Sequence, residues 1–249
     1  MSYPTRKHKI LELIEKNDSV EVPFLAEYLD TSEITIRRDL NRMATEGLVY
    51  RTHGGAMKIS LATAPVAFAQ KVVANVAAKK EVALKAAQLI SDGDVIFLDC
   101  GSTVFEMCEF IKNKSIKVVT NSLPVAFALA GSAVQLNFVG GEIDAERQAA
   151  HGQMAVEHIS RYRVQKAFLG FDGISVANGI SANSEKEVEI TKAMYDCASE
   201  TYFLGVSQKL NSDKYLPFLE IEKVKNLILE NKLSESLVKP YISAGIEVI

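Results

Sequence analysis

The chain has 249 residues, of which 48% are hydrophobic and 24% are charged. This length predicts one large domain with room for a small second one, and this composition excludes disordered, collagen-like and low-complexity proteins. No apolar run approaches the roughly 18 residues of a membrane span, and no apolar signal-peptide segment follows the charged N-terminus. Three widely separated cysteines, Cys100, Cys108 and Cys197, predict reduced core thiols in a cytoplasmic protein without disulfides, metal sites or cofactors.

The net charge of −3 is not spread evenly along the chain. Residues 1–58 carry 9 basic and 9 acidic residues, whereas residues 59–249 carry 19 basic and 22 acidic residues. The N-terminal segment is therefore not basic in bulk. Any nucleic-acid site in it must depend on the face that its arginines occupy.

The first 58 residues have the hydrophobic periodicity of short helices. Apolar residues recur at helical spacing between residues 10 and 14, and a second helix begins near Pro23, where the missing N–H costs nothing. Ser32 predicts the N-cap of a third helix, with Gly47 as its C-cap. A short β-prone run and the turn Gly54-Gly55 follow, which indicates a small β-wing.

The third helix has one apolar face and one polar face. At roughly 100° per residue, Ile36, Leu40 and Met43 form a narrow stripe that we expect to be buried. The major groove of DNA admits one helix, in which arginine can read guanine and asparagine can read adenine. We therefore predict a DNA-binding face made of Ser32, Ile34, Thr35, Arg37, Arg38, Asn41 and Arg42.

Three assignments on this face stay open. We expect one of Arg37 and Arg38 to contact bases and the other to contact phosphate, and the sequence does not say which. A merely solvated helix surface would also carry arginines. Ile34 can meet a thymine methyl, although packing against the preceding turn is favoured.

From residue 76 onward, short β-branched runs alternate with amphipathic helices. This alternation predicts an α/β domain at residues 76–249 with a mostly parallel sheet and helices on both faces, joined to the all-α winged domain at residues 1–58 by a connector at residues 59–75. Strands are expected at residues 95–99, 116–120, 134–139, 166–171, 201–206, 226–229 and 246–249, and helices at residues 77–91, 103–112, 123–130, 153–162, 185–199 and 234–243.

Small and polar residues follow five successive strands of this domain. Open α/β sheets bind ligands at the carboxyl ends of their strands. A glycine and hydroxyl residues at a helix N-terminus, as in residues 99–103, suit a phosphate because free N–H groups point toward it. A turn or capping role is the alternative for each single cluster, whereas five clusters after five successive strands favour a binding site. The residues after the next four strands are Asn121 and Ser122, Gly140 and Gly141, Asp172, and Lys209.

The segment TSEITIRRDLNRMATEGLVYRTHGGAM at residues 31–57 resembles the helix-turn-helix of the DeoR family. It has that family's S-x-x-T-I-R-R-D-L, then a glycine, then R-x-H-G-G-A. The resemblance implies that the third helix enters the major groove and that Arg51 and His53 on the wing contact phosphates. Both residues can instead support the fold of the wing, His53 by a hydrogen bond to its turn. We expect Asp39 to be structural and to hold Arg42 or the helix face, because a carboxylate does not suit phosphate.

Residues 75–249 are similar to the DeoR sensor domain, which shows D-x-G-[ST]-T, T-N-S, G-G, G-x-x-G, an acidic helix with K-x-M, and S-x-K. These motifs stand here at residues 99–103, 120–122, 140–141, 170–173, 187–194 and 207–209. The resemblance implies a Rossmann-like fold similar to ribose-phosphate isomerase, glucosamine-phosphate deaminase and CoA transferases. It also implies phosphorylated sugars as effectors.

That resemblance assigns the phosphate to Gly101, Ser102 and Thr103, with Lys209 and Arg147 as cations. The sequence departs from the family pattern at Val206, where an aspartate is frequent, and at Leu229-Glu230, where a T-D pair is frequent. The expected effector site comprises Asp99, Gly101, Ser102, Thr103, Asn121, Ser122, Gly140, Gly141, Arg147, Asp172, Glu187 and Lys209.

These features together predict a transcriptional regulator, most simply a repressor of carbohydrate-metabolism genes. Its expected partners are a double-stranded DNA operator, a phosphorylated sugar and further copies of itself in a dimer or tetramer, without a membrane. One alternative is a sugar-phosphate isomerase or deaminase that uses an acid near residues 172–189 as base, although these acids also suit a solvated helix start. The other is a protein-interaction module. Similarity to the fold of these enzymes does not imply their activity. A DNA-binding segment in the same chain favours ligand sensing over catalysis.

Overall fold

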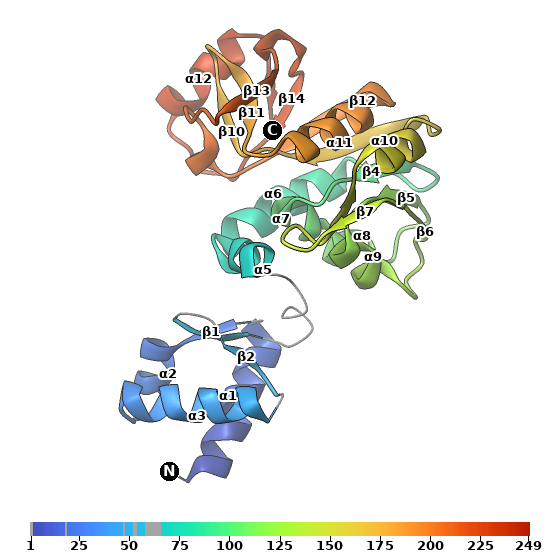
Figure 1. The fold of residues 1–249 in the computed structure, drawn as a ribbon. Coiled ribbons are helices and arrows are strands. Elements are labelled where there is room, and N and C mark those ends of the chain that lie inside the picture. Colours follow the sequence, from blue (N-terminus) through green and yellow to red (C-terminus); the bar gives the residue numbers. More distant parts are fainter. Residues whose placement is uncertain (1, 18, 47, 52–53, 58–65) are drawn as a thin grey trace. The chain divides into compact units, whose positions relative to one another are not determined.

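The computed structural model describes residues 2–17, 19–46, 48–51, 54–57 and 66–249. The chain forms two compact units, residues 1–73 and residues 74–249 (Figure 1). The predicted cap Gly47, the predicted phosphate contact His53 and residues 58–65 of the predicted connector lie outside the described residues. No helix in the described ranges is long and apolar enough to cross a membrane.

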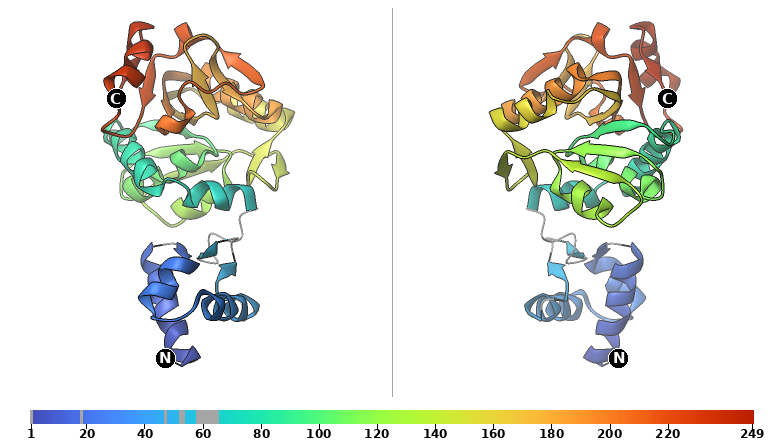
Figure 2. Two further views of the ribbon diagram at one scale, coloured as in Figure 1. Left: turned by 90° about the vertical axis from the view of Figure 1, so that its left-hand side faces the viewer. Right: turned by 90° about the vertical axis from the view of Figure 1, so that its right-hand side faces the viewer.

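The first unit is a winged helix-turn-helix. The strands β1, β3 and β2 form an antiparallel sheet in that order. The sequence did not indicate β1, which pairs with the wing strand β3 and so ties the wing to the helices (Figure 2). The elements are α1 (Tyr3–Asn17), β1 (Ser19–Glu21), α2 (Val22–Tyr28), α3 (Glu33–Thr45), β2 (Tyr50–Arg51), β3 (Gly55–Met57) and, closing the unit, α5 (Val66–Val73).

The local signals of α3 are confirmed. The hydroxyl oxygen of Ser32 accepts a hydrogen bond from the Thr35 N–H at 3.3 Å, as an N-cap does. Ile36, Leu40 and Met43 are fully buried in the core of this unit. The apolar stripe therefore sets the rotation of α3, and the opposite face stays in solvent.

A buried ion pair joins α1 to α3. The Arg6 guanidinium donates to the Asp39 carboxylate through Nε at 2.6 Å and through a terminal nitrogen at 3.1 Å, and both residues are buried. Asp39 is structural, as expected, but its partner is Arg6 and not Arg42. The bidentate geometry fixes the position of α3 as well as supplying energy.

Removing one member of this pair leaves the other charge buried without its partner. We expect Asp39→Ala to lower the free energy of unfolding of this unit by about 3 kcal/mol. Hydrogen exchange measured peptide by peptide on the full chain should show faster exchange in α1 and α3.

The matched control is Glu33→Ala, which removes an exposed carboxylate that pairs with Arg37 on the same helix. That change should cost less than about 0.5 kcal/mol. Equal effects of the two substitutions on exchange in α1 and α3 would show that the buried pair does not hold these helices together.

The second unit contains a seven-stranded sheet in which every neighbouring pair is parallel, in the order β15-β14-β12-β9-β4-β5-β6. All seven predicted strands belong to this sheet. The strands are β4 (Val95–Leu98), β5 (Lys117–Thr120), β6 (Gln135–Phe138), β9 (Val164–Gly170), β12 (Ala198–Leu204), β14 (Asn226–Ile228) and β15 (Glu247–Val248).

Helices cover both faces of the sheet, which confirms the predicted α/β class. Alternate residues of β4 belong to different cores: Ile96 and Leu98 pack in one and Phe97 in the other. The first core takes residues from α6, α7, α8 and α9, and the second from α10, α11 and α12. The helices are α6 (Val76–Gln88), α7 (Ser102–Phe105), α8 (Met107–Ile111), α9 (Leu123–Leu129), α10 (Gln153–Ile159), α11 (Glu185–Asp196) and α12 (Glu235–Ser243), with short 3-10 turns η1 (Ser207–Lys209) and η2 (Ile221–Lys223).

Two small antiparallel sheets were not predicted. One is a hairpin that inserts between β6 and α10, and the other extends from the end of β9. Their strands are β7 (Glu142–Asp144) and β8 (Ala149–His151) in the hairpin, and β10 (Gly173–Ser175), β11 (Gly179–Ala182) and β13 (Leu216–Leu219) in the second sheet.

Candidate functional site

The predicted DNA-binding residues of α3 lie on its solvent-exposed side. Ile34 is 80% exposed, so the expectation that it packs against the preceding turn is wrong. Ile34 lies at the start of the helix on the side opposite the buried stripe of α3, so the core does not cover its side chain. Arg37, Arg38, Asn41 and Arg42 are all exposed, and Thr35 is partly exposed.

The arginines of this unit differ in their partners. Arg37 pairs with Glu33 at 3.2 Å, and Arg42 pairs with Glu46 at 3.0 Å while its guanidinium lies 4.1 Å from the centre of the Tyr3 ring. Arg38 has no hydrogen bond or ion pair to any of the described residues. Its guanidinium is therefore the one on α3 whose donors are not used within the described part of the chain.

The wing contacts α3 through Arg51. Its Nε donates to the Asn41 side-chain oxygen at 2.8 Å, and a terminal nitrogen donates to the Gly55 carbonyl oxygen. Partial burial and the nearby charge of Arg37 lower the pKa of Arg51. Arg51 thus joins the helix to the wing, which agrees with the alternative of wing support, although the sequence did not indicate Asn41 as its partner.

Because Arg38 and Arg42 differ in their partners, we expect their substitution by alanine to have different effects on thermal stability. Arg38→Ala should weaken binding to the preferred duplex by roughly 10-fold to 100-fold, because a bidentate contact to guanine contributes about 1–3 kcal/mol. It should leave the melting temperature unchanged, whereas Arg42→Ala should also lower it by removing the contacts to Tyr3 and Glu46. Fluorescence anisotropy with labelled DNA and thermal melts measure the two effects.

Lys16→Ala is the charge-matched control, since Lys16 is exposed in the last turn of α1. It should change affinity only through long-range charge, equally for all sequences. An Arg38→Ala protein with unchanged sequence preference would show that Arg38 does not read bases.

The seven-stranded sheet of the second unit has a topological switch point between β4 and β9, where successive strands begin to be added on the opposite side of β4. The chain runs from β4 outward to β5 and β6, then returns to β9 beside β4 and continues outward to β12, β14 and β15. The loops after β4 and β9 therefore diverge. Open α/β sheets bind ligands in the crevice that such a switch point creates at the carboxyl ends of the strands.

Asp99 links the loop after β4 to the end of β9. Its carboxylate accepts hydrogen bonds from the Gly101 N–H at 2.7 Å and from the Gly170 N–H at 2.5 Å. A Cβ on Gly101 would lie 2.9 Å from Asp99 Oδ1 and 3.4 Å from the Gly170 Cα, so this close approach requires glycine. Burial raises the pKa of Asp99, and the two N–H donors and the charge of Lys209 oppose that rise.

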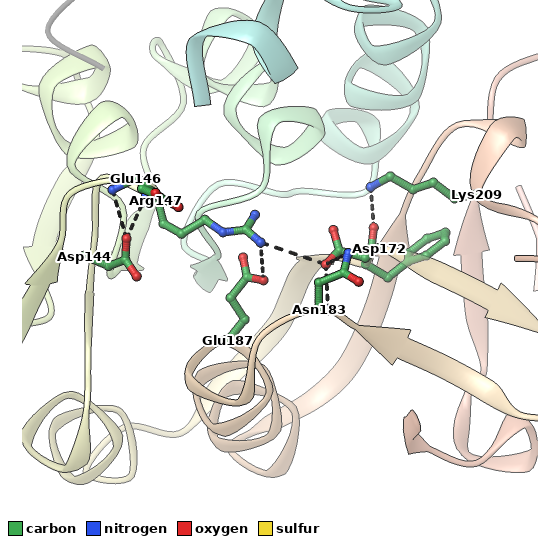
Figure 3. Close-up of polar contacts among 8 residues, drawn as sticks. Asp144, Glu146, Arg147, Asp172, Asn183, Glu187 and Lys209 are labelled. Atoms are coloured by element: carbon green, nitrogen blue, oxygen red, sulfur yellow. Dashed lines mark hydrogen bonds and ion pairs between the residues drawn. The ribbon is translucent and has the colours of Figure 1, made fainter. Parts of the chain in front are cut away.

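Arg147 reaches this region from the hairpin loop 145–148 (Figure 3). Its guanidinium lies 2.7 Å from a Glu187 oxygen on α11 and 4.0 Å from an Asp172 oxygen in the loop after β9. Asp172 also accepts from the Asn183 N–H at 3.1 Å. The structure thus brings together three predicted residues from separate segments, and Glu187 is not part of a merely solvated helix start.

Lys209 approaches the same region from the opposite direction (Figure 3). Its ammonium group donates to the Phe171 carbonyl oxygen and lies 5.2 Å from the centre of the Phe171 ring. Three carboxyl groups, of Asp99, Asp172 and Glu187, therefore accompany two cations. The crevice is not an open cluster of positive charge, and both cations have partners within the chain.

Several other predicted effector residues have structural contacts. The Ser122 hydroxyl caps α9 by accepting from the Val125 N–H at 3.4 Å. A Cβ on Gly141 would lie 2.6 Å from the His151 carbonyl oxygen, so this glycine permits the packing of β7 against β8 and α10. The Gly140 N–H donates to His158 Nδ1 at 3.2 Å. Ser102 and Thr103 begin α7, where helix N–H groups have no intrahelical acceptor.

The departures from the family pattern also have a structural reason. Val206 and Leu229 are buried in the domain. The Glu230 carboxylate accepts from the Ser207 N–H at 3.0 Å and from the Ser207 hydroxyl at 2.5 Å. Glu230 was not predicted, and it holds the turn that presents Lys209. The only feature of the sequence that could have indicated Glu230 was the position of an acidic residue after the strand predicted at residues 226–229.

A separate hollow of about 230 Å³ lies on the second antiparallel sheet, lined by Asn178, Pro217, Phe218, Leu219, Glu220 and Lys223. None of the predicted effector residues lines it. Its charged groups, Glu220 and Lys223, pair with each other at 3.0 Å, whereas the predicted effector residues gather at the switch point.

Glu187→Gln should free Arg147 for an anion. We expect the affinity for inorganic phosphate to rise by about fivefold, which corresponds to about 1 kcal/mol for a partly exposed ion pair. The measurement is isothermal titration calorimetry on the full chain. Glu189→Gln, which removes an exposed carboxylate from the same helix, is the control. If both variants gained affinity equally, net charge and not the Arg147 pair would be responsible.

Comparison with known families agrees with both units. Residues 6–61 match the DeoR-like helix-turn-helix domain, and residues 74–231 match the DeoR C terminal sensor domain. One family thus accounts for both the winged helix-turn-helix and the domain that contains the switch point. The chain belongs to the DeoR family of DNA-binding transcriptional regulators.

Individual relatives span nearly the whole chain. It is 32% identical to the lactose phosphotransferase system repressor of Lactococcus lactis, over 94% of this chain and 93% of the relative. It is also 32% identical to the HTH-type transcriptional regulator FruR of Bacillus subtilis, over 89% of this chain and 88% of the relative. Ribose 5-phosphate isomerase A from Methanocaldococcus jannaschii is 20% identical with a TM-score of 0.42, over 55% of each chain. The two sequence relatives are named as regulators and not as enzymes.

Proposed function

We propose that this regulator represses genes of sugar utilisation and responds to a phosphorylated sugar bound at the β4–β9 switch point. The observation that carries the proposal is the joining, in one chain, of an exposed recognition helix, whose Arg38 has no partner among the described residues, and a switch point at which polar groups from four segments meet. Similarity to a lactose phosphotransferase system repressor supports a sugar-derived effector and a role in repression.

The proposed operator contacts are those of the exposed face of α3. Arg38 reads a base, because its donors have no partner among the described residues, and Arg37 contacts phosphate. Arg51 positions the wing through Asn41. The proposed functional boundaries are residues 1–58 for the reader and residues 76–249 for the sensor, with residues 59–75 as the connector.

The proposed effector contacts lie at the carboxyl ends of the strands. The N–H groups at the start of α7 meet the phosphate together with Ser102 and Thr103, while Arg147 and Lys209 supply charge. One winged module buries little DNA surface, so the proposed active form is a dimer or tetramer that reads repeated half-sites.

A ligand can change operator affinity only through its different affinities for two states of the protein. We expect one member of a panel of phosphorylated sugars to raise the melting temperature of the full chain. The same compound should shift the affinity for a duplex selected from a random library by at least about fivefold, as a coupling of 1 kcal/mol requires.

The non-phosphorylated sugars are the controls for the phosphate contact, and turnover of the panel compounds is assayed in parallel. Conversion of any panel compound by the purified protein would favour the enzymatic alternative. A compound that stabilises the protein without any change in operator affinity would contradict the proposed coupling.

A further inference from the structure

Three buried polar atoms lack hydrogen-bond partners within the described part of the chain. They are Thr103 Oγ1, Asn121 Oδ1 and His151 Nε2. Their residues are 2%, 0% and 1% exposed, so bulk water does not satisfy them. A buried polar atom without a partner is costly to the folded protein, and a native structure that keeps several of them usually uses them for binding.

The three residues belong to segments at the carboxyl ends of adjacent strands. Thr103 lies in α7 directly after β4, and Asn121 directly follows β5, the neighbour of β4 in the sheet. The Asn121 carbonyl oxygen accepts from the Ala150 N–H at 2.8 Å, and its side-chain nitrogen donates to the Ala150 carbonyl oxygen at 3.0 Å. His151 is the next residue of β8. The hairpin thus holds His151 beside the end of β5.

The asparagine presents an acceptor. Its side-chain nitrogen is occupied by Ala150, which fixes the orientation of the amide and leaves the oxygen unpartnered. A carboxamide oxygen only accepts hydrogen bonds. The group that completes this site must therefore be a donor.

The histidine presents an acceptor as well. His151 Nδ1 lies 3.2 Å from the Ala149 carbonyl oxygen, which can only accept, so Nδ1 carries the proton. In the neutral ring Nε2 is then a bare acceptor. Burial lowers the pKa of His151, as do the charges of Arg147 and Lys186, while Asp144 and the bond to Ala149 oppose this. The ring is therefore neutral at pH 7.

Two acceptors do not suit a phosphate, whose oxygens are acceptors themselves at pH 7. They suit hydroxyl groups, which donate, and the Thr103 hydroxyl can either donate or accept. We propose that Asn121 Oδ1 and His151 Nε2 accept hydrogen bonds from hydroxyl groups on the carbon chain of the effector, which makes His151 a specificity-determining residue for a polyhydroxylated ligand. This inference rests on the proposed effector site and assigns its hydroxyl-binding half.

The first test needs no ligand. Nitrogen-15 chemical shifts of His151 in the full chain at pH 7.5 should show the tautomer with the proton on Nδ1. A ring protonated on Nε2, or a cationic ring, would overturn the proposal, because neither presents an acceptor.

The second test uses His151→Leu and the control His8→Leu, which removes an exposed histidine of the first unit. The probes are hexose and pentose phosphates, the corresponding free sugars, and inorganic phosphate. We expect the best-binding sugar phosphate to lose at least about tenfold in affinity for His151→Leu, as loss of one hydrogen bond to a buried group requires. Inorganic phosphate should bind both variants and the parent chain equally.

His151→Gln, which keeps an acceptor oxygen, should restore part of the lost affinity. The melting temperature of ligand-free His151→Leu, which loses the Nδ1 bond to Ala149 as well as the unpartnered Nε2, verifies that this variant is folded under the binding conditions.

The outcomes separate the two proposals. A sugar phosphate that binds the parent and His151→Leu equally would overturn the hydroxyl contact and leave the proposed function standing. Free sugars that bind as well as their phosphates, with loss on His151→Leu, would support the hydroxyl contact and contradict the phosphate site. Absence of binding by every sugar and sugar phosphate would overturn both.

Discussion

The carboxylate of Asp99 accepts one backbone N–H from Gly101 in the loop after β4 and another from Gly170 at the end of β9, and the arrangement of the sensor depends on this pair of contacts. They link the two chain segments at the point where the order of strands in the sheet changes direction. Burial disfavours the carboxylate, and two N–H donors and the charge of Lys209 oppose that cost. Asp99 thus fixes the backbone of the switch point, whereas Arg147 and Lys209 reach it with long side chains (Figure 3).

In the DNA-binding unit, too, a buried carboxylate fixes two elements against each other. Asp39 is also a buried carboxylate, held here by the two nitrogens of Arg6, and it fixes α3 against α1. The apolar stripe alone leaves α3 free to slide along the core, whereas a bidentate pair fixes its position. With α3 fixed, the direction of Arg38 is set by the helix, and Arg51 sets the wing against Asn41.

The strands that were predictable from the sequence are those of the parallel sheet. Such strands are buried on both faces and read as short apolar runs, as in Val95–Leu98. Strands such as β1 and β8 have three residues each and take their conformation from distant partners, so no local pattern marks them. Asp39 and Arg147 contact residues that are distant in the sequence, and the contact of His151 depends on the fold of the hairpin. The spacing of residues along the chain therefore did not predict these contacts.

The charge balance of the crevice has a consequence for sensing. Arg147 already pairs with Glu187, and Lys209 already donates to Phe171, so an anion that recruits either cation must first break a contact within the chain. Glu187 belongs to α11, whereas Arg147 belongs to the hairpin loop. An anionic group that takes Arg147 therefore releases a link between these two elements, while the acceptors at Asn121 and His151 engage the uncharged part of the same ligand. A ligand that exchanges one internal contact for several external ones has different affinities for the two arrangements, which is the condition for shifting an equilibrium between them.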